Sequence, residues 1–118
     1  MKIISAVLIL VSSLSLSLQD NAKVIGDWKG DLDAQGTTLT LIVHVTEKDG
    51  ALVATMDSPA QGAYDMAFDT ISFTDDVLKL SMSAIAGTYE GEMKDGKFEG
   101  KWSQGGMSLD LNLEKEEK

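Results

Sequence analysis

The sequence predicts an all-β domain: an antiparallel meander of eight strands that forms a small lipocalin-like β-barrel or a curled half-barrel. Three observations lead to this fold class. Apolar and polar residues alternate through most of the chain after residue 20, as in strands with one buried face. Gly, Asp-Gly and Asp-Asp interrupt the alternation about every ten residues, and no helical spacing lies between them. Because an apolar sheet face must be covered, a two-layer β-sandwich is the alternative, although consecutive hairpins favour the barrel.

Short turns bound the predicted strands, and the turns that end at Gly50 and Gly96 carry glycine where a hairpin favours positive φ. The region 66–74 is irregular because its apolar residues change parity midway. A bulge near Asp69-Thr70 would reconcile its two halves. The predicted strands are 24–33, 37–47, 51–57, 66–74, 77–85, 87–94, 97–104 and 107–114.

Three segments place an aromatic residue midway between two glycines: GDWKG (26–30), GTYEG (87–91) and GKFEG (96–100). Alternate residues of a strand share a face, so each ring points to the same side as its glycines. In one interpretation the rings lie flat on bare backbone and fill the interior. In the other, the glycines widen a pocket for an apolar or sugar-like ligand. The first interpretation expects Trp28, Tyr89 and Phe98 to cover Gly30, Gly91 and Gly100.

The N-terminal residues 1–19 have the layout of a cleaved secretory signal peptide. Met1-Lys2 is positively charged, 3–11 is almost wholly apolar, and small residues follow. The apolar run is too short to span a bilayer as a helix, so no stable membrane insertion is expected after cleavage. The sequence therefore predicts a single β-barrel-like domain over 20–118 in a secreted or periplasmic protein.

Composition excludes several classes of partner. There is no cysteine, so the exported domain has no disulfides. Ten basic residues against 19 acidic ones give a formal charge of -9. Nucleic-acid binding needs clustered Lys or Arg, and anionic lipid repels such a chain, so neither is an expected partner.

No pattern in the sequence indicates catalysis or a cofactor. His44 is the only histidine, and its parity places it on the outer face of a strand. One histidine without cysteine gives no plausible zinc site. No Gly-x-Ser-x-Gly motif supplies a nucleophile. We therefore expect a protein that is not an enzyme, with no metal and no cofactor, and a stand-alone hydrolase is a remote alternative.

The longest irregular connection, 57–64, combines an acid, a hydroxyl, an amide and an aromatic ring, and loops often carry function. Five methionines fall on or near the inward parity, and they either fill gaps in the core or make an adaptable apolar wall for a ligand: Met56, Met66, Met82, Met93 and Met107. The modest core predicts that any pocket is small or shallow. Together these features predict binding of a small apolar or amphipathic ligand, or of a partner protein, at one barrel mouth. The residues expected there are Trp28, Met56, Ser58, Gln61, Tyr64, Tyr89, Phe98 and Trp102.

Three segments carry a family resemblance: GDWKGDLDAQGTTLTLIVHVT, ATMDSPAQGA and GTYEGEMKDGKFEGKWSQGGMSLDLNLEK. Together they resemble the secreted β-domain that precedes the catalytic domain in some bacterial α/β-hydrolases of the esterase and dienelactone-hydrolase type. In that family the nucleophile, acid and histidine lie in the hydrolase domain, so the resemblance implies no catalytic residue here. It implies an alternative function, an accessory domain of a separately encoded α/β-hydrolase.

Overall fold

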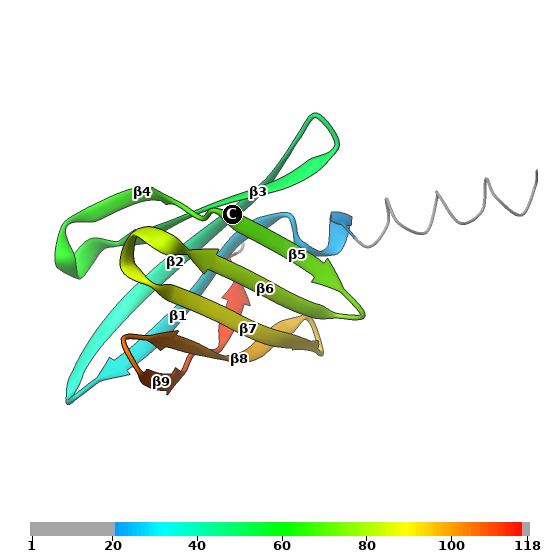
Figure 1. Ribbon diagram of the computed structural model, residues 1–118. Helices are drawn as coiled ribbons and strands as arrows, with labels where there is room; N and C mark the ends of the chain where they lie inside the picture. The colour runs from blue at the N-terminus through cyan, green and yellow to red at the C-terminus, as the bar shows by residue number, and fades with distance from the viewer. Residues whose placement is uncertain (1–20, 117–118) are drawn as a thin grey trace, which may run out of the picture.

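The computed structural model describes residues 21–116, which form one curled antiparallel sheet with almost no helix (Figure 1). The predicted all-β half-barrel is confirmed, and a single sheet rather than a two-layer sandwich covers the apolar face. The predicted signal peptide, 1–19, lies outside the described residues. The strands are β1 (Gly26–Ala34), β2 (Thr37–Lys48), β3 (Ala51–Ser58), β4 (Ala63–Ala67), β5 (Thr70–Thr74), β6 (Val77–Met82), β7 (Gly87–Lys94), β8 (Lys97–Gln104), β9 (Met107–Asp110) and β10 (Leu113–Lys115). Two short 3-10 helices are η1 (Pro59–Gln61) and η2 (Ser83–Ile85).

The two edge strands of the sheet are consecutive in the chain. The strand order is β4-β3-β2-β1-β10-β8-β7-β6-β5, so the link between β4 and β5 joins one edge to the other. At this link the Phe68 N–H donates to the Ala54 carbonyl of β3 (3.0 Å). The next N–H, that of Asp69, donates to the Ser81 carbonyl of β6 (2.8 Å). The irregularity expected near Asp69-Thr70 is therefore a change of partner strand rather than a bulge, and the predicted strand 66–74 is two strands.

The last predicted strand, 107–114, also divides in two. β9 pairs with β8 alone, whereas β10 lies between β1 and β8. Between them the Leu111 N–H donates to the Gly100 carbonyl (2.8 Å), so the chain keeps its bond to β8 as it reaches β1. Residues 21–116 form ten strands rather than the predicted eight, because these two regions each change partner midway.

Aromatic side chains fill the end of the barrel where the described chain begins. Residues 21–24 form a helical turn, and Trp28 is 1% exposed. The Trp28 indole donates from Nε1 to the Val24 carbonyl (2.8 Å), which holds the turn against this end. Phe98 packs on Trp28 with ring centroids 4.7 Å apart and meets Phe73 edge-on at 5.9 Å. This end is therefore closed.

At two of the three glycine–aromatic segments, the ring does not cover the glycine that the sequence predicts. Tyr89 lies over Gly91 as predicted, and its hydroxyl also reaches Gly100. That hydroxyl donates to the Leu111 carbonyl (2.9 Å). Gly30 instead faces the last strand, because an added Cβ would stand 2.9 Å from Leu113 Cδ2 and closer still to backbone. The prediction that Trp28 covers Gly30 and Phe98 covers Gly100 is therefore wrong.

We expect Gly100→Ala to destabilise the fold severely. A Cβ at Gly100 would stand 2.6 Å from Gly91 Cα and 2.7 Å from the Tyr89 hydroxyl oxygen, and the backbone atom cannot move aside as a flexible side chain can. Overpacking of this kind costs about 1–3 kcal/mol. Urea unfolding should show this loss, whereas Glu99→Ala, at the exposed neighbouring position, should change stability by less than about 0.5 kcal/mol. Equal stabilities of the two variants would contradict the close approach.

Candidate functional site

Four strand connections meet at the end of the barrel opposite the aromatic cluster, on the left in Figure 1. They join β1 to β2, β3 to β4, β6 to β7 and β8 to β9. Between them lies a hollow of about 560 Å³, which we call the mouth. Its lining is Leu32, Ala34, Leu39, Leu41, Met56, Gln61, Ala63, Met66, Ile85, Trp102, Gln104, Gly105, Met107 and Leu109.

Apolar side chains make up most of the mouth, both at its base and at its rim. Leu41 and Met56 are each 3% exposed and belong to the buried core. At the rim, Ile85 is 36% and Met107 43% exposed. Single exposed apolar residues are common, but these two border a hollow with an apolar wall, which is the usual character of a small-molecule site.

Two 3-10 turns bring side chains to this rim. Pro59 starts η1, and Gly62 closes it in the left-handed conformation (φ 67°), where its N–H donates to the Pro59 carbonyl (3.0 Å). At η2 Ala86 takes the same role (φ 52°) although it carries a Cβ. Each turn ends its strand and places its last residue, Gln61 or Ile85, in the lining.

The only polar side chains of the described lining are two amides, each already bonded to the protein. The Ser58 hydroxyl, which is 0% exposed, donates to Gln61 Oε1 (2.6 Å). The Trp102 indole donates from Nε1 to Gln104 Oε1 (2.9 Å). No charged side chain belongs to the described lining. The mouth therefore offers apolar surface and two oriented amides.

The predicted site residues divide between the mouth and the core. Met56, Gln61 and Trp102 line the mouth, and Ser58 supports it from beneath. Tyr64 follows the lining residue Ala63 but is 60% exposed and lies outside the lining. Three predicted residues are buried away from the mouth lining: Trp28, Tyr89 and Phe98.

Ile85 is a lining residue that the sequence does not predict, whereas Met107, one of the methionines expected to point inward, lines the mouth at its exposed rim. The region 77–85 was expected to be one strand, but η2 ends it at Ser83. The available signal was the run Ser83-Ala84-Ile85-Ala86, which breaks the alternation.

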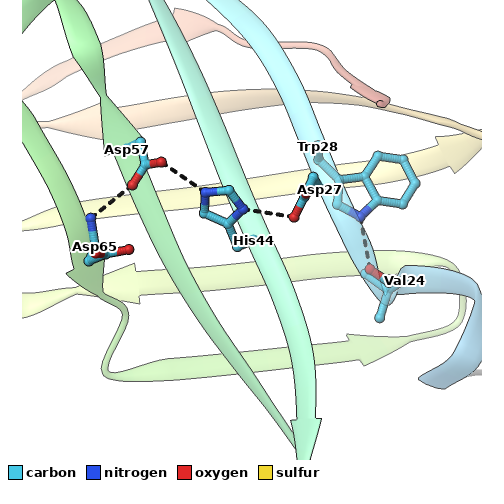
Figure 2. A network of polar contacts seen from close by, with 6 residues as sticks. All are labelled: Val24, Asp27, Trp28, His44, Asp57 and Asp65. Carbon is cyan, nitrogen blue, oxygen red and sulfur yellow. Dashed lines mark hydrogen bonds and ion pairs between the residues drawn. The ribbon is translucent and has the colours of Figure 1, made fainter. Parts of the chain in front are cut away.

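A second cluster lies on the outer face, where His44 bridges two carboxylates (Figure 2). His44 Nδ1 is 2.7 Å from Asp27 Oδ1, and its Nε2 is 2.9 Å from Asp57 Oδ2. The other Asp57 oxygen accepts the Asp65 N–H (2.8 Å). The bridge therefore ties β1, β2 and β3 together, and Asp57 also holds the middle of β4.

The carboxylates favour the charged form of His44. The hydrogen bond to Asp57, followed by that to Asp27, raises the pKa of His44 above its usual 6.5. The Asp65 N–H, followed by His44, lowers the pKa of Asp57 below its usual 3.8. The expected outward placement of His44 is correct, but its side chain is only 31% exposed and bridges two strands. Both ring nitrogens are engaged by carboxylates, which leaves neither for a catalytic hydroxyl.

Two further hollows are open grooves on polar outer faces of the sheet. One is bordered mainly by hydroxyl and charged side chains of β5 to β9, and another by charged residues of β1, β8 and β10. Solvated strand faces commonly have this composition. Among residues 21–116 no group of acids and histidine has the arrangement of a metal site, and no helix has the length and apolarity to cross a bilayer. The mouth is therefore the candidate site.

Comparisons with known proteins add no family: no family model, curated protein or solved structure matches this chain.

We expect the contribution of His44 to stability to fall as the pH rises. Because its pKa is raised on folding, its contribution is fully present below pH 6.5 and is lost as the pH rises through the folded pKa. The contribution of Asp57, whose pKa is lowered, is present above 3.8 and is lost as the pH falls through the folded value. His44→Gln should therefore lower the free energy of unfolding by about 1 kcal/mol near pH 6 and by less near pH 9.

Urea unfolding at the two pH values measures this difference. Thr46→Gln is the control, since Thr46 lies on the same strand with the same parity and is exposed. An equal loss at both pH values for His44→Gln would show that the bridge does not depend on the charge of His44.

Proposed function

We propose that this chain is an exported, non-catalytic β-domain that binds one small apolar or amphipathic molecule in the mouth. The observation that carries the proposal is the contrast between the two ends of the barrel. Aromatic rings fill one end, whereas the other holds an open hollow with exposed Ile85 and Met107 above buried Leu41 and Met56. Burial of such side chains under a ligand is favourable in proportion to the apolar area covered.

The size and chemistry of the mouth support a small ligand. Its volume of about 560 Å³ lies within the range of roughly 300–1,000 Å³ that is usual for small-molecule pockets. An apolar wall with a few convergent polar groups is the common composition of such sites. Here Gln61 and Gln104 are those polar groups.

A partner protein is the second candidate, and the exposed Tyr64 favours it. Tyr64 is 60% exposed on β4, an edge strand of the sheet, and aromatic side chains are enriched at protein interfaces. A separately encoded α/β-hydrolase is the partner that the sequence resemblance implies. Co-purification of the protein from its own host, followed by mass spectrometry, tests this candidate, and recovery without any hydrolase would count against it.

We expect the neutral fluorophore N-phenyl-1-naphthylamine to bind in the mouth with enhanced emission. Ala63→Phe should weaken binding about tenfold or more, because the new ring occupies the hollow that Ala63 lines. Ala67→Phe is the matched control, since Ala67 lies on the same strand but is exposed outside the described lining. Fluorescence titration gives the three dissociation constants. Absence of binding to the unmodified protein, or equal effects of the two variants, would refute this use of the mouth.

Export rests on the sequence of residues 1–19. We expect the intact mass of the protein recovered from its own host to correspond to a chain that begins near residue 20. A mass that includes Met1 to Leu10 would contradict cleavage.

A further inference from the structure

The two glutamines of the mouth each have one end fixed by the protein. Gln104 bonds to the Trp102 indole, and Gln61 bonds to the Ser58 hydroxyl. An amide side chain carries its acceptor and its donors on opposite branches. Fixing one branch therefore decides which one remains for a ligand.

At Gln104 the orientation follows from chemistry. An indole Nε1–H is a donor only, so the atom of Gln104 that lies 2.9 Å from it must be the carbonyl oxygen. The NH₂ group of Gln104 is then the branch that is left for the hollow that this residue lines.

At Gln61 the contact length gives the same orientation. The Ser58 hydroxyl is wholly buried and lies 2.6 Å from Gln61 Oε1. This distance is typical of an O–H···O bond and short for a bond between nitrogen and oxygen. Gln61 therefore also retains its NH₂ donors for the mouth.

Charge narrows the chemistry of the ligand further. The described lining contains neither a cation to neutralise a carboxylate nor an acid to pair with an amine. A buried charge without a partner is costly. The formal charge of -9 also repels anions from the whole molecule. These constraints favour a ligand without charge.

We infer that the mouth selects neutral molecules with an apolar body and a carbonyl acceptor, such as ketones, esters or amides, through the NH₂ groups of Gln61 and Gln104. This inference rests on the proposed binding function. It adds a chemical class of ligand to that function. The size of the mouth and its apolar wall do not by themselves determine this class.

Competition with bound N-phenyl-1-naphthylamine tests the selectivity. The competitors are hexyl methyl ketone, its isostere in which a methylene group replaces the carbonyl oxygen, and a straight-chain carboxylate of equal length. We expect the ketone to bind about tenfold more tightly than the isostere, as one well-formed hydrogen bond would provide, and the carboxylate to bind most weakly.

Gln104→Glu is the informative variant because it keeps an oxygen for Trp102 while replacing the NH₂ donor with a second acceptor. It should reduce the preference for the ketone over the isostere, and the double variant Gln61→Glu/Gln104→Glu, which has neither donor, should abolish it. Gln104→Met removes the donor without adding charge and should have the same effect on the ratio. Gln61→Glu repeats the test at the other amide and covers the case in which a Gln104 variant fails to fold, which thermal unfolding reports.

The outcomes separate the two proposals. If the fluorophore binds in the mouth but ketone and isostere compete equally, the carbonyl selectivity is wrong and the binding function stands. If the ketone preference survives in all the folded variants, the glutamines are not its source and the inference is overturned. If no fluorophore binds, both proposals fail.

Discussion

The close contact of Tyr89 with Gly91 and Gly100 is the constraint on which the rest of the barrel depends. The ring lies where side chains on these glycines would be, and its hydroxyl donates to the Leu111 carbonyl between β9 and β10. Desolvation in this site raises the pKa of Tyr89, so the hydroxyl stays protonated and remains a donor. A buried hydroxyl without a partner would be costly, so the ring also determines where the last strand lies.

That placement explains why the two ends of the barrel differ. After Leu111 the chain moves from β8 alone to a position between β1 and β8, and Gly30 gives it the necessary space. Beyond this point the sheet encloses Trp28 and Phe98, which close one end. Before it, the interior side chains near the four connections border the mouth, and Ile85 and Met107 are exposed at its rim.

Much of this arrangement could be predicted from parity, because alternation depends on which face a residue occupies. The inward placement of Met56, Tyr89 and Trp102 follows from it. The changes of partner strand near Phe68 and Leu111 could not be predicted from parity, because a strand keeps its alternation whichever neighbouring strand it bonds to. Parity also does not distinguish the two ends of a barrel. The sequence therefore does not separate the buried rings of Trp28, Tyr89 and Phe98 from the residues that line the mouth. The contact between His44 and Asp27 could not be predicted either, because it depends on the register of β1 against β2, which places these two residues opposite each other.

The outer bridge and the mouth are linked through one strand end. Asp57 points outward to His44 and Asp65, and the next residue, Ser58, points inward to hold Gln61. Neighbouring residues of a strand face opposite sides, so Asp57 belongs to the outer bridge while Ser58 belongs to the interior. The outer bridge and the support of Gln61 in the mouth are therefore held by consecutive residues of β3. In a chain with 19 acidic residues, the single histidine lies between two of them, and their hydrogen bonds favour its charged form and join three strands of the sheet.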